Sequence, residues 1–250
     1  MIIEYFRPET LDEAVRLLGR TTPKTVPLGG GTVLNAPSDQ QVAVVDLQKL
    51  GLDKIELKGR TLNLGAAVTL QALLDEKDIQ PALRQAIRLE SGYNLRHSGT
   101  VAGSLVSGGG RSPFLAAMLA LDVQLLWQPG DQTQSLGEFL PLRARDWPGE
   151  LITQVSFSIQ TELAYHYVAR TPADRPVVCA AAARWPSGRT RIVLGGYGNA
   201  PLTILDGEAN EGVLDAAEAA YLTAEDEWAS SDYRTQVAKV LVRRCLDEFN

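Results

Sequence analysis

Leu28-Gly29-Gly30-Gly31-Thr32-Val33-Leu34 is the stretch of this sequence that decides how the rest is interpreted. It follows the short β-prone run Thr25-Val26-Pro27 and precedes the loop-forming residues Asn35-Ala36-Pro37-Ser38. Three consecutive glycines let the backbone adopt positive φ and bring its amide groups close to a ligand that a Cβ atom would block. The hydroxyl of Thr32 adds one more hydrogen-bond donor. Two interpretations remain open: a cradle for a phosphate group, and a strand-to-loop turn that needs glycine only for its shape.

A second glycine-bearing segment favours the ligand-binding interpretation. It lies further along the chain and reads Gly99-Thr100-Val101-Ala102-Gly103-Ser104. A simple turn would explain one glycine segment, but it does not explain a second segment that can also present backbone amides. The sequence therefore predicts an anion-binding site to which both segments contribute.

The overall composition is that of a globular protein and excludes several classes of partner. A chain of 250 residues can form one large domain or two to three small ones, with a substantial core. A net charge of −6 argues against a general nucleic-acid or anionic-membrane binder, because either would need a basic face. No apolar run approaches the length of a membrane span, and Met1–Tyr5 lacks the basic start of a signal peptide. We expect a cytoplasmic protein without membrane insertion.

The cysteines and histidines follow no metal-binding motif. Cys179 and Cys245 lie far apart without C-x-x-C spacing, so we expect neither a zinc site nor a protein-bound iron–sulfur cluster. His97 and His166 are the only histidines, and no H-E-x-x-H pattern surrounds them. The sequence also has no G-x-S-x-G elbow. If the chain belongs to an enzyme, a bound cofactor is expected to carry the difficult chemistry.

The hydrophobic pattern divides the chain into three parts of an α+β fold. Residues 1–52 read as a β-α-β-β unit, in which Thr10 caps a helix that ends at Gly19. Residues 53–148 begin with a hairpin, continue with helices that start at Leu70 and Pro81, and end in a polar boundary segment. Residues 149–250 read as an antiparallel sheet with helices. The expected strands of that sheet are Leu151–Ile159, Ala164–Arg170, Val177–Trp185 and Thr190–Tyr197, and the expected helices are Asp206–Ala220 and Tyr233–Glu248.

Several segments, in the same order, resemble the FAD-binding subunit of the molybdenum hydroxylases. That family includes the medium subunit of carbon monoxide dehydrogenase and the flavin domain of xanthine dehydrogenase. The similarity runs over essentially the whole chain, and each segment is short but their order is specific. The matching segments are Tyr5–Ala14, Gly29–Leu34 (similar to A-G-G-T-D-L), Leu64–Leu70 (I-G-A-x-V-T-L), Gly99–Leu105 (G-T-I-G-G-N-L), Leu119–Asp122 (L-A-L-D) and Ser230–Arg234 (S-x-x-Y-R).

The resemblance implies a two-subdomain, PCMH-like FAD-binding fold followed by a C-terminal antiparallel sheet with helices. It implies FAD as the cofactor, with the flavin between the N-terminal pair of subdomains and the C-terminal one. Backbone amides of both glycine segments would hold the FAD pyrophosphate, and Ile152 would pack near the isoalloxazine. The implied binding residues are Leu28, Gly29, Gly30, Gly31, Thr32, Val33 and Leu34, then Thr100, Val101, Ala102, Gly103 and Ser104, and finally Ile152.

The resemblance also implies partners. Electrons would pass from a large molybdopterin subunit through [2Fe–2S] clusters on a small subunit to FAD, and then to NAD+, a quinone, oxygen or another acceptor. The chain itself would supply no catalytic side chain and no metal ligand. The lack of clustered cysteines agrees with this, since the iron–sulfur clusters would lie on the partner.

Five positions depart from the family pattern, and three of them, Ala102, Pro113 and Tyr167, motivate an alternative. Val33 replaces an aspartate, Ala102 a glycine, Ser104 an asparagine, Pro113 an aspartate near FAD, and Tyr167 a lysine near the flavin. The alternative is a non-catalytic scaffold that keeps the fold and the partner interface but has lost or weakened FAD binding. A third hypothesis, a flavin oxidase of the broader fold, is disfavoured because no acid–base cluster for a substrate is visible.

Overall fold

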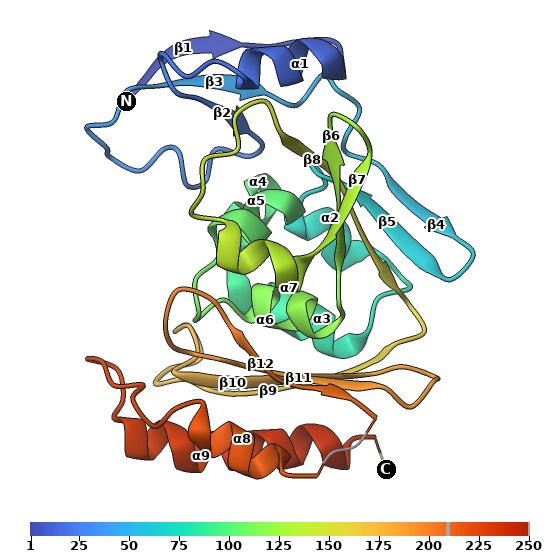
Figure 1. The fold of residues 1–250 in the computed structure, drawn as a ribbon, viewed down its shortest axis with the longest axis vertical. Helices are drawn as coiled ribbons and strands as arrows, with labels where there is room; N and C mark the ends of the chain where they lie inside the picture. The colour runs from blue at the N-terminus through green and yellow to red at the C-terminus, as the bar shows by residue number, and fades with distance from the viewer. Residues whose placement is uncertain (209–210, 250) are drawn as a thin grey trace. The chain divides into compact units, whose positions relative to one another are not determined.

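The computed structural model describes residues 1–208 and 211–249, and the chain separates into two compact units, each assembled from several stretches (Figure 1). Unit 1 combines Met1–Glu76, Tyr93–Ser107 and Gln124–Phe157. Unit 2 combines Lys77–Gly92, Gly108–Val123 and Ser158–Asn250. The three domains predicted from the sequence, with boundaries after residues 52 and 148, are continuous stretches of chain. That division stays a prediction. In the described part of the chain, no helix is both long and apolar enough to cross a membrane.

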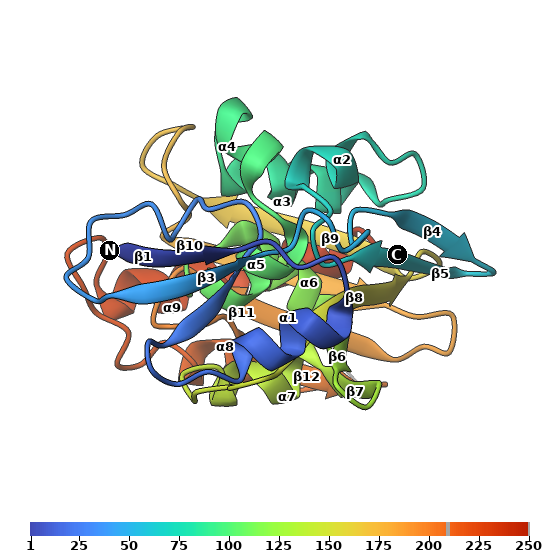
Figure 2. The same ribbon diagram turned by 90° about the horizontal axis from the view of Figure 1, so that it is seen from above.

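Unit 1 begins with the expected β-α-β-β element, which is confirmed. Strands β1 (Ile2–Phe6), β2 (Thr25–Leu28) and β3 (Val42–Asp46) form a parallel sheet in the order β1-β3-β2, with helix α1 (Leu11–Leu18) beside β2 (Figure 2). The hydroxyl of Thr10 accepts the Glu13 N–H at 3.3 Å and so satisfies an otherwise free amide of the first helical turn. Ala14 and Leu18 of α1 pack on the buried β3 residue Val45.

The remainder of unit 1 is a five-stranded sheet with short helices. The strands, in spatial order, are β4 (Ile55–Lys58), β5 (Thr61–Gly65), β8 (Leu151–Ser158), β6 (Gln124–Gln128) and β7 (Gln132–Ser135). The helices are α2 (Leu70–Asp75), α4 (Tyr93–Ser98), α5 (Val101–Ser107) and α7 (Leu136–Phe139), followed by a 3-10 turn at Leu140–Leu142. The predicted hairpin and the predicted cap of α2 are confirmed, since the hydroxyl of Thr69 accepts the Ala72 N–H at 3.1 Å.

The prediction that Leu151–Ile159 belongs to the C-terminal antiparallel sheet is wrong. This segment is β8, which lies between β5 and β6 and pairs Ile152 with Trp127. The fourth C-terminal strand is β12 (Leu202–Gly207), which overlaps the start of the helix predicted at Asp206–Ala220. The helix itself, α8, spans only Val213–Ala219, and residues 209–210 lie outside the described residues. A strand buried on one face has the same pattern in either sheet, so the sequence does not reveal its neighbour.

Unit 2 is built around a four-stranded antiparallel sheet in the order β12-β11-β10-β9. Strands β9 (Glu162–Val168), β10 (Val178–Arg184) and β11 (Thr190–Gly195) are mostly apolar where they are buried, with Thr190 and Arg191 as buried polar residues of β11. Helices α8 and α9 (Ser231–Asp247) cover one face, and α3 (Pro81–Glu90) and α6 (Pro113–Ala120) cover the other (Figure 1). Every residue of α6 is buried. The predicted start of α3 at Pro81 is confirmed.

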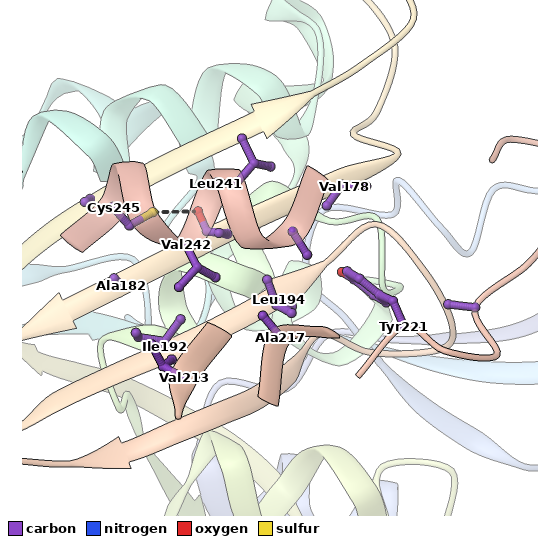
Figure 3. Close-up of a cluster of buried hydrophobic side chains, with 14 residues drawn as sticks. Val178, Ala182, Ile192, Leu194, Val213, Ala217, Tyr221, Leu241, Val242 and Cys245 are labelled. Carbon is purple, nitrogen blue, oxygen red and sulfur yellow. Dashed lines mark hydrogen bonds between the residues drawn. The ribbon is translucent and has the colours of Figure 1, made fainter. Parts of the chain in front are cut away.

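The core under α8 and α9 combines small and large apolar residues of the sheet with apolar residues of the helices (Figure 3). Ala180 and Ala182 of β10 let α9 approach closely, and the Cys245 thiol donates to the carbonyl oxygen of Ala180 at 3.5 Å. Burial raises the pKa of Cys179 and of Cys245 to about 12 in each case. Both cysteines are therefore neutral packing residues at physiological pH.

A buried carboxyl group fixes the start of α6. Ser112 accepts the Leu115 N–H at 3.0 Å as the N-cap and donates its own hydroxyl to Oε2 of Glu90 at 2.6 Å. The Phe114 N–H and the Arg175 guanidinium also bond Glu90, at 3.2 and 3.0 Å. Burial raises the pKa of Glu90, although Arg175 and the two donors of the α6 start oppose the shift.

A buried guanidinium organises the start of α9, and it explains the S-x-x-Y-R segment. The hydroxyl of Ser230 caps the helix by accepting the Tyr233 N–H. Arg234 is completely buried and donates to Asp226 at 2.6 Å and to three backbone carbonyls. Those carbonyls belong to Val177 (3.3 Å), Ala224 (2.7 Å) and Ala229 (2.8 Å). One side chain thus joins the residue before β10 to the loop before α9.

Replacing this guanidinium with an apolar chain of similar length is expected to destabilise the protein strongly. Arg234→Met leaves three buried carbonyls and one carboxylate without their donor, a loss of about 3–5 kcal/mol in the free energy of unfolding. Urea unfolding measures the loss. Arg243→Met on the exposed face of the same helix is the control, with an expected change within about 0.5 kcal/mol. Equal effects of the two substitutions would contradict the structural role of Arg234.

Glu90 is expected to make stability depend on pH in the acid range. Because burial raises its pKa in the folded state, its contribution to stability is fully present below the unfolded-state pKa and is lost as pH rises through the folded-state pKa. Glu90→Gln should remove this component, in a range of rising pH that begins at the unfolded-state pKa of about 4.3. The measurement is urea unfolding across that range, with Glu225→Gln on an exposed residue as the control. If the free energy of unfolding depends on pH in the same way in Glu90→Gln and in the wild type, the assignment is wrong.

Candidate functional site

Unit 1 contains a cavity of about 500 Å³ beside the first glycine segment. Its walls come from the turn after β2, the start of α5, and the loop that leads into β8. Ten of the predicted site residues line it: Gly29, Gly30, Gly31, Thr32, Val33, Leu34, Thr100, Ala102, Gly103 and Ile152. The fold therefore brings the two glycine segments and Ile152 to one cavity.

Three predicted residues do not line this cavity. Val101 is completely buried, and its N–H donates to the carbonyl of Val68 at 2.8 Å. Ser104 is half-buried, and its N–H is bonded to the Thr100 carbonyl at 2.9 Å within the first turn of α5. Leu28 borders a second cavity of about 590 Å³, which shares Gly29, Gly30, Gly31 and Thr100 with the first.

The glycines of the first segment serve the packing of the chain against itself. A Cβ atom on Gly30 would lie 1.6 Å from the carbonyl oxygen of Ser98, and one on Gly29 would lie 2.8 Å from Oγ1 of Thr100. The two glycine segments thus touch backbone to backbone. Gly31 has a different reason to be glycine, because its φ of +69° is in the left-handed region.

The first segment also presents a row of free backbone donors. In the described part of the chain, the N–H groups of Gly29, Gly30, Gly31 and Thr32 donate to no other group of the protein. The second segment is different, because the N–H of Gly103 is taken by Oγ1 of Thr100 at 3.2 Å. Successive backbone amides without partners can form an anion-binding concavity. The phosphate-cradle interpretation therefore gains support mainly from the first segment.

Basic side chains around the cavity were not predicted from the sequence. Arg20, Lys24, Arg143 and Arg145 line it, although the chain as a whole is acidic. Lys24 forms an ion pair with Asp146 at 2.5 Å. Burial lowers the pKa of Arg143, but an arginine stays charged at neutral pH. These residues come from a turn and from the polar boundary segment, where they follow no motif, so only the fold reveals that they surround one space.

An aromatic group forms another part of the cavity wall. The indole rings of Trp127 and Trp147 lie with their centroids 5.1 Å apart and nearly parallel, at 21°. The Phe139 ring is tilted against both, at 5.4 and 5.8 Å. Ile152 pairs with Trp127 across β6 and β8. This part of the wall suits a planar apolar ring.

The cavity lacks the side chains of acid–base or metal chemistry. Its carboxyl groups are those of Asp146, which is paired with Lys24, and Glu150. Among residues 1–208 and 211–249, no group of three histidine, cysteine, aspartate or glutamate side chains is placed to hold a metal ion. The arrangement can bind a ligand through amides, positive charge and apolar contact.

The departures from the family pattern fall in both units. The Ala102 methyl group lines the cavity without filling it, since about 500 Å³ remains. Pro113 lies in the first turn of α6, where proline is tolerated because the N–H is free in any case. Tyr167 lies on β9 with its ring stacked on Tyr165 at 6.0 Å. Pro113 and Tyr167 belong to unit 2.

Comparison with known proteins identifies a matching family and several relatives. Residues 1–157 match the protein family described as the FAD binding domain in molybdopterin dehydrogenase. The protein YgfM of Escherichia coli K12, of uncharacterised function, is 30% identical over 97% of this chain and 94% of its own length. The carbon monoxide dehydrogenase medium chain of Afipia carboxidovorans is 27% identical over 98% of this chain and 95% of its own.

Solved structures share the fold. Carbon monoxide dehydrogenase from Hydrogenophaga pseudoflava superposes with a TM-score of 0.80 at 22% identity, over 99% of this chain and 96% of that chain. Quinoline 2-oxidoreductase from Pseudomonas putida 86 gives a TM-score of 0.78 at 22% identity, over 98% and 96%. The predicted α+β, FAD-binding fold with a C-terminal antiparallel sheet is confirmed at this level. The chain therefore belongs to the FAD-binding domain family of the molybdopterin dehydrogenases, an oxidoreductase family whose cofactor is FAD.

Proposed function

We propose that the cavity of about 500 Å³ in unit 1 is where this chain binds FAD. The observation that carries the proposal is the run of four unpartnered backbone amides at Gly29–Thr32 on the cavity wall. These amides and the basic side chains suit a pyrophosphate, while the aromatic wall suits a ring. FAD combines both kinds of group in one molecule.

The residues present fit the cofactor by position and by chemistry. Gly29, Gly30, Gly31 and Thr32 would donate to the pyrophosphate oxygens, with Arg143 or Arg145 adding charge. Ile152 and its neighbours would hold an apolar ring away from water. Bound FAD supplies electron and hydride transfer. The chain itself binds, orients and excludes solvent, and no side chain of the cavity is assigned a proton-transfer role.

We infer that the chain is the electron-transfer subunit of a molybdopterin-dependent dehydrogenase or hydroxylase complex. Its partners would be a small [2Fe–2S] subunit and a large molybdopterin subunit, and its acceptor NAD+ or another oxidant, in the cytoplasm. The similarity to a carbon monoxide dehydrogenase medium chain over nearly the full length of both supports this. The buried, neutral cysteines support it as well, because the iron–sulfur ligands have to come from another chain.

The visible absorption spectrum of the purified protein tests FAD binding directly. We expect bands near roughly 370 and 450 nm that persist after FAD is added in excess and the sample is desalted. Such bands would also show that Ala102, Pro113 and Tyr167 are tolerated. A folded protein that stays colourless, alone and together with its partner subunits, would favour the scaffold alternative.

Gly30→Ala is expected to abolish retention of FAD. The new methyl group would lie 1.6 Å from the Ser98 carbonyl oxygen, so the two glycine segments must move apart and the amides lose their alignment. The measurement is the ratio of flavin to protein after desalting, with circular dichroism to verify folding. Gly92→Ala is the matched control, since its Cβ would meet nothing within 4 Å. Wild-type flavin content in Gly30→Ala would contradict this account of the site.

A further inference from the structure

The cavity of unit 1 lies between two stretches of chain that are far apart in the sequence. Residues 18–34, from the end of α1 to the glycine segment, supply one wall. Part of the opposite wall is the rim loop, residues 143–149, which leads from the 3-10 turn to β8. The rim-loop residues that border the cavity are Arg143, Arg145, Asp146, Trp147 and Pro148.

One ion pair joins the rim loop to the opposite wall. Nζ of Lys24 lies 2.5 Å from Oδ1 of Asp146, and the two residues are 122 positions apart in the sequence. Between residues 18–34 and residues 144–150, the described part of the chain contains no other hydrogen bond or ion pair. The side of the cavity between these two walls is therefore closed by a single polar contact.

The rim loop has few other interactions that would hold it in place. Its backbone hydrogen bonds are local, from the Arg145 N–H to the Leu142 carbonyl at 2.9 Å and from the Glu150 N–H to the Trp147 carbonyl at 3.3 Å. The stacking of Trp147 on Trp127 holds one residue of the loop, but most of the others are exposed. A segment with few buried contacts opens locally at a low cost in free energy.

We propose that the rim loop is a lid of the FAD cavity and that the Lys24–Asp146 ion pair holds it closed, so that this pair slows both entry and release of the cofactor. The proposal rests on the proposed function, because it takes FAD as the ligand of the cavity. The side chains of Lys24 and Asp146 are 47% and 77% exposed. A pair this exposed is weak and is screened by salt, so its effect on the two rates is small and depends on ionic strength.

Asp146→Asn separates a lid from a direct effect of charge on the ligand. A carboxylate at the rim of the cavity repels an anion, so without a lid its removal would strengthen FAD binding and slow release. With a lid, the same change makes opening easier, and entry and release both become faster while their ratio, the Kd, stays the same. The two explanations thus predict opposite changes in the release rate.

A second ion pair of unit 1 provides the matched control. Nζ of Lys49 lies 2.6 Å from Oε1 of Glu9, and the two side chains are 47% and 73% exposed, close to the values of the first pair. Neither residue borders the cavity. Glu9→Gln therefore removes an equivalent surface ion pair without touching the lid.

Stopped-flow fluorescence of the flavin measures both rates. Mixing FAD with the flavin-free protein gives the association rate, and dilution of the loaded protein gives the release rate. The proteins are wild type, Asp146→Asn, Glu9→Gln and the double variant Lys24→Glu with Asp146→Lys, which restores an ion pair with its charges exchanged. Circular dichroism verifies that each variant is folded.

We expect both rates to rise roughly two- to fivefold in Asp146→Asn at low salt, with the Kd unchanged. The ratio of each rate to that of the wild type should approach one in about 1 M NaCl, because salt screens the pair in the wild type. The double variant should return towards the wild-type rates, and Glu9→Gln should match them. Unchanged or slower release from Asp146→Asn, or faster release without faster association, would overturn the lid and leave the proposed function intact. No FAD binding by the wild type would overturn both.

Discussion

The contact between Gly30 and the Ser98 carbonyl is the constraint on which the site in unit 1 depends. Side chains of any size at Gly30 would hold the two glycine segments apart. With hydrogen there, the turn after β2 lies directly against the end of α4 and the start of α5. In this arrangement the amides of Gly29–Thr32 bond to no other group of the described chain, and these residues line the cavity. Packing, more than flexibility, is the reason for glycine at this position.

Buried charges in unit 2 have a different purpose. Glu90, Arg234 and the pair Arg191–Asp122 each join a strand or helix to a segment that regular hydrogen bonding does not reach. Arg191 bonds Asp122 at 2.7 Å and Asp206 at 2.6 Å, so β11 is fastened to the end of α6 and to β12. Each of these groups is satisfied by several partners within unit 2. These buried charged groups stabilise the fold, and none of them borders the cavity of unit 1.

Local features of the fold were predictable because they depend on neighbouring residues. The caps at Thr10 and Thr69 bond amides three residues away, and the glycine turn before Asn35 is set by backbone conformation. Pairing between distant segments was not predictable. The place of β8 between β5 and β6 depends on partners that lie far away in the sequence, and a one-faced burial pattern is compatible with many of them.

The same distinction applies to the site. Both glycine segments carry recognisable motifs, so most of their residues were identified in advance and were found at one cavity. Trp127 and Trp147 carry no motif, and they meet only because β6 and the loop before β8 are adjacent in the folded unit. The basic residues of the cavity were missed for the same reason. Sequence motifs identified the backbone donors, whereas the side chains of the wall required the three-dimensional arrangement.

The interleaved order of the two units has a consequence for synthesis of the chain. Unit 1 is complete once residue 157 has been made, but by then α3 and α6 of unit 2 have also emerged. Helix α6 is apolar on all sides, and the strands that cover it, β10 and β11, are made only later. During that interval α6 has α3 to pack against, but the apolar surface that β10 and β11 later cover stays exposed. Exposed apolar surface of this kind makes a folding intermediate prone to aggregation, so α6 is a segment that a chaperone would protect during synthesis.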